Sequence, residues 1–337
     1  MNKPVTILFS SAGRRVELMN CFRAAAAALG CDAKILAVDA RPQLSSACQA
    51  ADASFSVPLC ASDAFIPAVR EICLRERVDL LIPTIDPELA PFAKARDEFA
   101  AAGTQVCVSH PGVIAIARDK LATSQFFKRV GCDAPQTALL RDVLADGSAW
   151  RFPVIVKPID GSSSEGFQVV PSMDALRALR MNPDGTIVQS QILGTEYTVN
   201  LFFDDAGLRC AIPHRRIETR AGEVAKARTE RVAALTSAAQ RVGDALAGQA
   251  RGPLCFQAII PENGVPHLIE LNARFGGGYP LAQRAGANFA CWILEAHLRR
   301  TSTASDSWQE GITMLRYDAA FFLPDTRANP FSAQTLF

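Results

Sequence analysis

The sequence predicts an α/β protein with an N-terminal parallel sheet and two α+β subdomains that follow it. Strand-like and helix-like patterns alternate over residues 5–110, and such alternation favours a parallel sheet with right-handed crossovers. A smaller α+β pattern starts at about residue 132, and longer strand-like runs follow it. A chain of 337 residues is too long for one small core and suits two or three packed units.

The N-terminal unit starts with a continuous apolar run at Val5–Phe9, which is typical of a strand buried on both faces. The Ala-rich segment Val16–Leu29 predicts a helix that Gly30 can close. The other elements expected in this unit are strands at Lys34–Val38, Leu80–Ile82 and Gln105–Val108 and helices at Ala64–Arg77 and Glu88–Ala102.

The rest of the chain begins with a linking helix at Arg118–Val130, which ends at Gly131. The pattern weakens after Arg300, where Ala319–Leu323 is either a final strand or an interface. The remaining expected elements are strands at Val154–Val156, Thr186–Gln189, Tyr197–Phe203, Cys255–Ile260 and His267–Asn272 and a helix at Val232–Leu246.

Composition excludes several classes of protein. Apolar residues make up 49% and charged residues 20% of the chain, an ordinary globular balance, and the net charge of +1 favours neither nucleic acid nor an acidic membrane. No apolar run approaches the roughly 18 residues of a membrane helix, and the first residues read directly as a strand rather than a secretory signal. The ten cysteines form no C-x-x-C pair, so we expect reduced thiols and a cytoplasmic protein.

The turn Ser10–Arg15 leaves the first strand and opens the first helix. A helix N-terminus with two arginines, Arg14 and Arg15, favours an anion or carboxylate. Asp39 ends the second strand, where a dinucleotide-binding fold keeps its ribose acid, but the glycines of that fingerprint are absent. The alternative is that Gly13 only permits a tight turn.

Asp86 and Glu88 follow another strand of the same sheet. Ligands collect at the carboxyl ends of parallel strands, so these two acids are candidates for holding a substrate amine. An equally good interpretation is that Asp86 caps a helix that starts with Pro87.

Two segments favour phosphate and nucleotide binding. Lys157 ends an apolar strand and is followed by the Gly/Ser-rich loop Gly161–Gly166, whose amides and hydroxyls can fold over phosphates, although such a loop alone often only connects a hairpin. It is not a P-loop, because no G-K-[ST] follows.

The second segment lies farther along the chain. Glu196 starts a strand where an acid can bind ribose hydroxyls, and Ile192 and Leu193 can line an adenine pocket. The alternative is that a polar residue stands at a strand start by chance, which is common.

The stretch His267–Arg274 favours a metal site. Alternation along a strand puts Glu270, Asn272 and Arg274 on one face and Ile269 and Leu271 on the other. Carboxylate and amide oxygens suit Mg²⁺, and an arginine there can stabilise a transferring phosphoryl group. A hairpin with the preceding strand would bring Gln257 close to Glu270.

Taken in order, these segments resemble the signature of the ATP-grasp superfamily, in its branch like the carbamoyl-phosphate synthase large chain, which includes the pyrrolysine-pathway ligase. The resemblance covers residues 5–300. It implies a Rossmann-like pre-ATP-grasp domain at 1–112, a central subdomain with the Gly/Ser-rich loop at 113–191, and a C-terminal subdomain with the metal site at 192–337. The two subdomains would clasp ATP.

The resemblance also implies roles for individual residues, with ATP and Mg²⁺ (or Mn²⁺) as cofactors. The implied nucleotide contacts are Lys120, Lys157, Gly161, Ser162, Ser163, Ser164, Gly166, Gln189, Ile192 and Glu196. The implied metal ligands are Gln257, Glu270 and Asn272, and the implied catalytic residues are Arg274 and Lys226. Two residues depart from the common pattern: Gln189 stands where many relatives carry glutamate, and Gln257 lowers the charge available for a second metal ion.

The function that the resemblance implies is that of a carboxylate–amine ligase. It would activate a small-molecule carboxylate with ATP as an acyl phosphate and form a C–N bond. Residues at the substrate end would come from Arg14, Arg15, Asp86, Glu88 and Arg216, with His214, Arg215 and Glu218 as looser candidates. The alternatives are a non-catalytic ATP-binding regulatory protein, against which the intact metal row argues, and an NAD-dependent oxidoreductase. We expect no nucleic-acid or membrane partner, and a homodimer is the commonest assembly.

Overall fold

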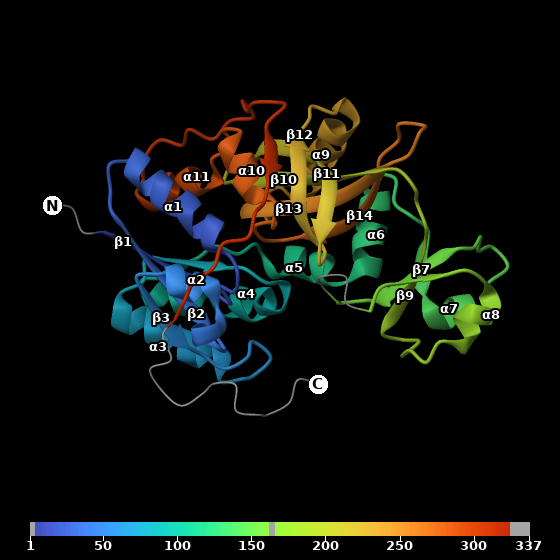
Figure 1. Cartoon of the computed structure of the whole chain (residues 1–337), viewed down its shortest axis with the longest axis horizontal. Coiled ribbons are helices and arrows are strands. Elements are labelled where there is room, and N and C mark those ends of the chain that lie inside the picture. The colour runs from blue at the N-terminus through green and yellow to red at the C-terminus, as the bar shows by residue number, and fades with distance from the viewer. Residues whose placement is uncertain (1–3, 162–165, 324–337) are drawn as a thin grey trace.

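The computed structural model describes residues 4–161 and 166–323. These residues form three sheets, and Figure 1 shows them as an N-terminal domain, a large antiparallel sheet and a small separate subdomain. The N-terminal sheet is parallel, with strand order β3-β2-β1-β4-β5. Its strands are β1 (Val5–Ser10), β2 (Ala33–Asp39), β3 (Ala53–Ser56), β4 (Leu80–Pro83) and β5 (Gln105–Val106). The predicted parallel sheet is confirmed, but β3 was not predicted because its sequence, ASFS, has no apolar run.

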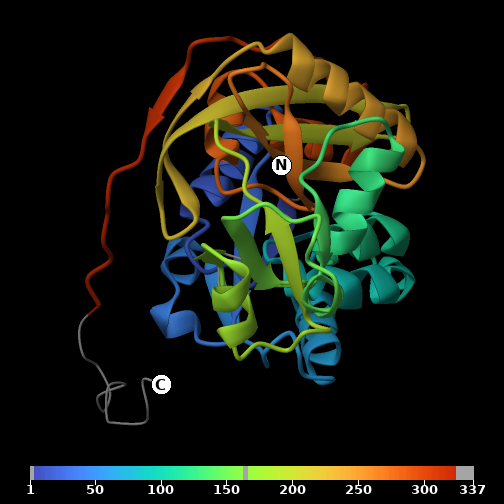
Figure 2. The same ribbon diagram turned by 90° about the vertical axis from the view of Figure 1, so that its right-hand side faces the viewer.

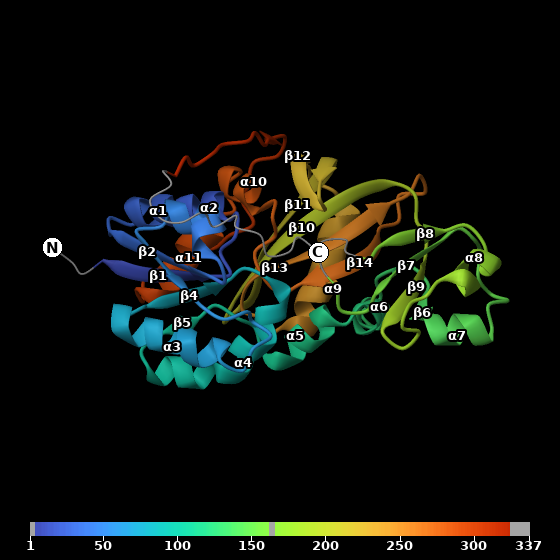
Figure 3. The same cartoon turned by 60° about the horizontal axis from the view of Figure 1, so that its bottom comes forward.

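Helices cover both faces of this sheet (Figure 3). The side chains of β1 alternate between two cores, with Leu8 in one and Ile7 and Phe9 in the other. This placement confirms a strand buried on both faces. The covering helices of the domain are α1 (Val16–Ala28), α2 (Ser46–Ala50), α3 (Phe65–Glu76) and α4 (Asp86–Ala101), with a short 3₁₀ turn at Pro42–Leu44.

The linking segment differs from the single helix predicted at Arg118–Val130. The chain forms α5 (Pro111–Arg118) and α6 (Lys120–Arg129), and Asp119 lies between them. The Asp119 carboxylate accepts hydrogen bonds from the backbone amides of Leu121 and Ala122 at 2.8 and 2.9 Å. An aspartate in this position caps a new helix, which explains the break.

The central subdomain is a four-stranded antiparallel sheet with order β6-β9-β7-β8. Figure 2 views it end-on, with the large sheet arching above it. The two predicted strands are present, as β7 (Val154–Pro158) and β9 (Thr186–Ser190). The elements that were not predicted are short: β6 (Thr137–Leu139), β8 (Gln168–Val170), α7 (Leu140–Ala145) and α8 (Met173–Ala178).

The large sheet is antiparallel, with order β14-β13-β10-β11-β12-β15. The three predicted strands are present, and β11 and β12, whose charged residues resemble a solvated segment, complete the sheet. Its strands are β10 (Thr195–Asp204), β11 (Gly207–Arg220), β12 (Glu223–Thr229), β13 (Gly252–Ile260), β14 (His267–Asn272) and β15 (Thr313–Leu315). The helices of this part are α9 (Ala233–Leu246), α10 (Tyr279–Arg284) and α11 (Phe289–His297).

The C-terminal part joins the other units. Helices α10 and α11 pack against α1 of the N-terminal domain. After β15 the chain passes in front of that domain (Figure 1), and residues 319–323 form no strand, contrary to one of the two alternatives predicted for Ala319–Leu323. Within the described ranges 4–161 and 166–323, no helix has the length and apolarity needed to cross a membrane.

Candidate active site

A cavity of about 640 Å³ lies where the three units meet. This volume is in the range of small-molecule sites. The loops after β1 and β4, strand β7 of the central subdomain and one face of the large sheet all contribute to its walls.

Two lysines face the cavity side by side. Lys120 is the first residue of α6, and its ammonium donates to the carbonyl oxygen of Gly161. Lys157 lies on β7, where burial lowers its pKa to about 8; the charge of Lys120 acts in the same direction and Glu270 opposes it. Burial also lowers the pKa of Lys120. Two partly desolvated cations in one cavity favour binding of an anion.

The predicted phosphate loop is only partly described. Gly161 lines the cavity, whereas Ser162, Ser163 and Ser164 lie outside the described residues. Gly166 does not belong to the cavity wall; it has φ of +70°, and a Cβ there would lie 2.9 Å from the Pro158 ring. The positive φ and this close approach both require a glycine at this position.

The cavity wall around residues 189–196 mixes polar and apolar side chains. Gln189, Ile192 and Glu196 line the cavity as predicted, and the Gln189 amide donates to Thr137 Oγ1 at 3.0 Å. Leu193 is 75% exposed and does not line the cavity, contrary to the prediction. Sequence reasoning missed four apolar wall residues, which are Phe167, Ile155, Ile259 and Ile269.

Ile269 was predicted to face away from Glu270, yet both line the cavity. The register explains the difference, because Gln257 pairs with Glu270 while its neighbour Ala258 pairs with Leu268. Ile269 is therefore the extra residue of a β-bulge, which redirects a side chain locally. Leu271 stays buried in the core as predicted.

The polar row predicted for metal binding lies on one stretch of the β13–β14 hairpin. Gln257 pairs with Glu270, and Asn272 pairs with Cys255; Gln257, Glu270 and Asn272 all line the cavity. One carboxylate and two amide oxygens are hard donors that suit Mg²⁺ or Mn²⁺. Among the described residues no cluster of three His, Cys, Asp or Glu side chains could hold a metal by itself. The donor set therefore fits an ion that also takes oxygens from a phosphate ligand and water.

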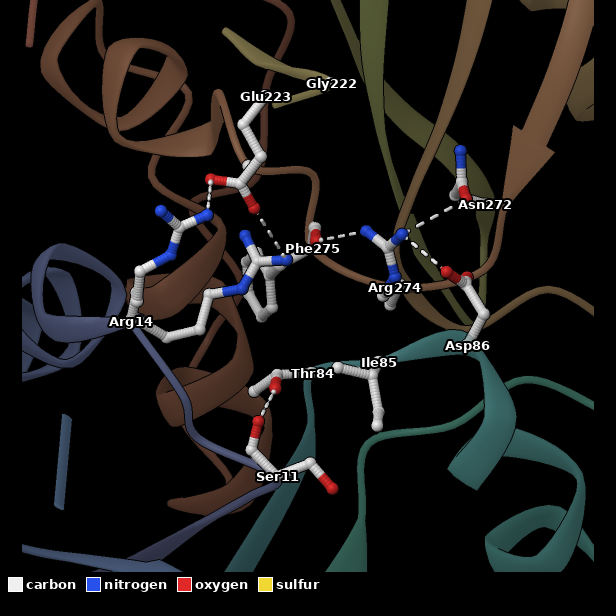
Figure 4. A network of polar contacts seen from close by, with 12 residues as sticks. Ser11, Arg14, Thr84, Ile85, Asp86, Gly222, Glu223, Asn272, Arg274 and Phe275 are labelled. Carbon is white, nitrogen blue, oxygen red and sulfur yellow. Dashed lines mark hydrogen bonds and ion pairs between the residues drawn. The ribbon is translucent and has the colours of Figure 1, made fainter. Parts of the chain in front are cut away.

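Arg274 joins this row to the N-terminal domain. Its guanidinium donates to Asp86 Oδ2 at 2.6 Å, to Asn272 Oδ1 at 3.2 Å and to the Phe275 carbonyl at 3.1 Å (Figure 4). Asp86 faces the cavity as predicted, but its carboxylate does not cap α4; the N-cap position is Ile85. These three hydrogen bonds hold the guanidinium beside the polar row, and Asp86 balances its charge.

Glu88 does not reach a ligand, which corrects its assignment to the substrate end. The side chain is completely buried and accepts hydrogen bonds from the hydroxyls of Ser10 and Ser11, both at 2.7 Å. It also accepts from the amides of Thr84 and Ile85 at 2.6 and 3.2 Å. Glu88 therefore ties the loops after β1 and β4 together and completes the cap of α4.

The opposite end of the cavity carries arginines. Arg14 and Arg15 line it as predicted and lie 4.0 and 3.7 Å from the carboxylate of Glu223. Sequence reasoning missed Glu223 and Arg316, whose side chains pair at 3.1 Å. Glu223 follows a two-residue turn at Ala221–Gly222 with positive φ angles, a signal that could have marked a hairpin tip. Asp39 accepts from the Gly13 amide at 3.1 Å and so stabilises this turn.

Four predicted residues differ from their expected places. Lys226 forms an ion pair with Glu218 at 2.5 Å, and neither residue is part of the cavity wall that the structure describes, so the catalytic assignment of Lys226 is not supported. Arg216 lines the cavity beside Glu196, with which it pairs at 3.0 Å, and not among the residues proposed for the substrate end. His214, on β11, is completely buried, with Nδ1 3.2 Å from the side-chain amide of Asn200.

Comparison with known proteins agrees with this arrangement. Residues 7–107 match the family described as PylC-like, N-terminal domain, and residues 117–278 match the ATP-grasp domain. The chain belongs to the ATP-grasp superfamily. Within it, this ATP-grasp protein lies in the carbamoyl-phosphate synthase-like branch, as its N-terminal match and the relative described next indicate.

The relatives match parts of this ATP-grasp protein. It is 25% identical over 136 residues to a carbamoyl-phosphate synthase of Methanobrevibacter smithii, which is 39% of this chain and 37% of the relative. It is 35% identical over 92 residues to a D-alanine–D-alanine ligase of Pseudomonas fluorescens, 25% of this chain and 28% of the relative. The matched parts are thus well under two thirds of these curated relatives.

The fold likeness extends over nearly the whole chain. The structure of an L-amino acid ligase from Bacillus licheniformis superposes with a TM-score of 0.68 at 17% identity, covering 93% of this chain and 79% of the ligase. This likeness establishes the ATP-grasp architecture with its N-terminal parallel-sheet domain.

Proposed function

We propose that this ATP-grasp protein is an ATP-dependent carboxylate–amine ligase that acts on small molecules. One observation carries the proposal: the two lysines, the polar row of Gln257, Glu270 and Asn272, and Arg274 all face one cavity. A protein that only binds a nucleotide has no need of this complete set. The matches to ligases that join small molecules support the same reaction class.

The cavity suggests how ATP would lie. Lys120 and Lys157 would hold its phosphates, Glu196 its ribose, and the part of the cavity beside Ile192 its base. Gln257, Glu270 and Asn272 would hold Mg²⁺ or Mn²⁺. When bound, the ion would neutralise phosphate charge during transfer. Arg274, fixed by Asp86, would stabilise negative charge on the transferring phosphoryl group without having to reorganise.

The reaction would take place in two steps. A carboxylate oxygen of the first substrate would form a bond to the γ-phosphorus, and the bond from that phosphorus to the β,γ-bridging oxygen would break, so that ADP leaves with the electron pair. The product is an acyl phosphate. An amine nitrogen would then attack the acyl carbon, lose a proton, and displace inorganic phosphate to give an amide. Exclusion of water from the cavity would protect the acyl phosphate from hydrolysis.

Phosphate release from Mg-ATP by the purified chain tests the proposal. Pools of small carboxylates are supplied with and without a pool of amines. Release that requires both pools, with an amide product seen by mass spectrometry, is the expected result. Tight ATP binding without release in any pool would contradict the ligase function and favour a nucleotide-binding regulatory protein.

We expect the reaction to take place in the cytoplasm. All ten cysteines are free in the structure, and none is paired in a disulfide, which suits the reducing cytoplasm, where Mg-ATP is abundant.

A further inference from the structure

The end of the cavity beyond Arg274 carries three arginines, Arg14, Arg15 and Arg316. Of the described cavity residues, seven are cationic and five are carboxylates, a surplus of two positive charges. Part of this surplus lies at Lys120 and Lys157 against Glu270, where ATP phosphates would compensate it. The remainder lies at the opposite end, where the cavity wall carries Arg14, Arg15 and Arg316 together with Glu17 and Glu223.

The arginines come from separate parts of the chain and meet on one carboxylate. Arg14 and Arg15 precede α1, Glu223 begins β12, and Arg316 directly follows β15. The Glu223 carboxylate lies 3.1 Å from Arg316, 3.7 Å from Arg15 and 4.0 Å from Arg14. Burial acts to raise the pKa of Glu223, but the nearby Arg15, Arg316 and Arg14 outweigh it and lower that pKa. One carboxylate thus positions three guanidinium groups without neutralising them.

The cluster is packed closely enough to fix its geometry. The side chains of Arg15 and Arg316 are 17% and 35% exposed. Arg316 also donates to the carbonyl of Gly277. A Cβ at Gly277 would lie 3.3 Å from Glu223 Cδ and 3.5 Å from Arg15 Nη1, so the backbone passes directly against the cluster. Burial and the charge of Arg274 lower the pKa of Arg15, and the carboxylates of Glu223 and Asp86 act in the opposite direction.

The cluster is separate from the transfer centre. Figure 4 shows Arg274 between Asn272 on one side and Glu223 with Arg14 on the other. Arg274 is already bonded to Asp86 and Asn272. The carboxylate that attacks ATP must reach the metal row and Arg274, whereas the arginine cluster lies beyond them.

From this arrangement we propose that the carboxylate substrate carries a second anionic group, a carboxylate or a phosphate, which Arg15 and Arg316 bind while Arg14 contributes charge at the rim. The inference rests on the proposed ligase function and names the class of its acid substrate. Guanidinium groups bind either anion through paired N–H donors. A substrate anchored at that end would present its other carboxylate to the transfer centre.

The test compares three acceptor pools in phosphate release from Mg-ATP: monocarboxylates, dicarboxylates and phosphorylated carboxylates, each with the amine pool. We expect release with the dicarboxylate or the phosphorylated pool, and whichever is active identifies the second anion. The variant Arg316→Met should raise KM for the active acid by roughly tenfold to a hundredfold and leave KM for ATP within about twofold. Arg70→Met, which removes an exposed arginine paired with Glu98, serves as the matched control.

The outcomes separate the two proposals. Equal or better turnover of monocarboxylates would overturn the inference while leaving the ligase function intact, as would an Arg316→Met variant with an unchanged KM for the acid. If no pool releases phosphate, the proposed ligase function is wrong. Calorimetry then measures whether succinate or phosphoglycolate binds to the MgADP-saturated protein, which tests the anion site independently. Binding that Arg316→Met abolishes supports the site, and absence of binding by the unaltered chain overturns it.

Discussion

Asp86 and Arg274 form an ion pair of 2.6 Å between residues 188 positions apart, one at the start of α4 and the other just after β14. Their side chains are only 13% and 15% exposed. The pair joins the N-terminal domain to the polar row of the large sheet, so the position of the guanidinium depends on both units.

Asp86→Asn tests this dependence. The amide keeps the size of the side chain but removes the charge that balances Arg274, so the free energy of unfolding should fall by about 1–3 kcal/mol. Turnover should fall at least about tenfold because the guanidinium is no longer held in place, while the Kd for ATP changes little. Urea denaturation and steady-state kinetics provide the measurements. Asp97→Asn, at a 98% exposed carboxylate beside Arg96, should alter stability by less than about 0.5 kcal/mol; equal effects of the two variants would contradict the prediction.

Glu270→Ala should abolish activity without unfolding the chain. It removes the only carboxylate among the three proposed metal ligands, so we expect turnover to fall at least about a hundredfold and the Mg²⁺ concentration for half-maximal activity to rise. Thermal unfolding checks that the fold remains. Glu262→Ala removes an exposed carboxylate from the β13–β14 turn and should behave like the unaltered protein. Normal Mg²⁺ dependence in Glu270→Ala would show that the metal row is wrongly assigned.

ATP affinity should depend on pH through Lys157. Burial lowers the pKa of Lys157 to about 8 in the free protein, and phosphate oxygens beside the ammonium must raise it in the complex. The charged form binds, so affinity is full below pH 8 and weakens by up to about tenfold per pH unit above it. Binding in that range takes up protons.

Calorimetry at pH 8.5 in buffers of different ionisation enthalpy measures this proton uptake. Lys157→Met should bind ATP more weakly at neutral pH and take up fewer protons at pH 8.5. Lys128→Met, at an exposed position in α6, should retain both the affinity and the uptake. Proton uptake that persists in Lys157→Met would assign the titration to another group.

The buried His214 predicts a change in acid stability. Burial, together with the charge of Arg216, lowers the pKa of His214 to about 3. The unfolded chain therefore binds a proton at this residue between about pH 6.5 and 3 that the folded chain does not, and the folded state loses about 1.4 kcal/mol for each pH unit of acidification in that window. Relative to wild type, His214→Gln should show a shallower fall of unfolding free energy from pH 6 to 4, measured by urea denaturation. Parallel curves would contradict it.

The sequence predicts the parts of this protein where a local pattern determines the structure. The apolar run of β1 reflects burial on both faces of the strand, and the alternation of Glu270 and Asn272 with apolar residues in β14 reflects burial on one face. The segments not predicted depend on partners far along the chain. Strand β3 is short and half-buried and exists through its pairing with β2.

The candidate site shows the same division. The side chains of Lys157 and Glu270 could be assigned from their own strands and the family resemblance. Glu88 could not, because only the structure shows that four donors from two loops surround it. Arg316 follows a strand of three residues that pairs with β12, and no local pattern connects it with Arg15. The orientation of Ile269 depends on a single extra residue in the hairpin register.

The break between α5 and α6 has a mechanical consequence. Lys120, the first residue after the Asp119 cap, hydrogen-bonds through its backbone amide to Ile159 at 3.0 Å and through its ammonium to Gly161, both in the central subdomain. The rest of α6 packs against β14. Lys120 therefore connects the sheet of the central subdomain, through α6, with β14 of the large sheet. The position of this cation, which we propose binds the phosphates, thus depends on contacts with both sheets.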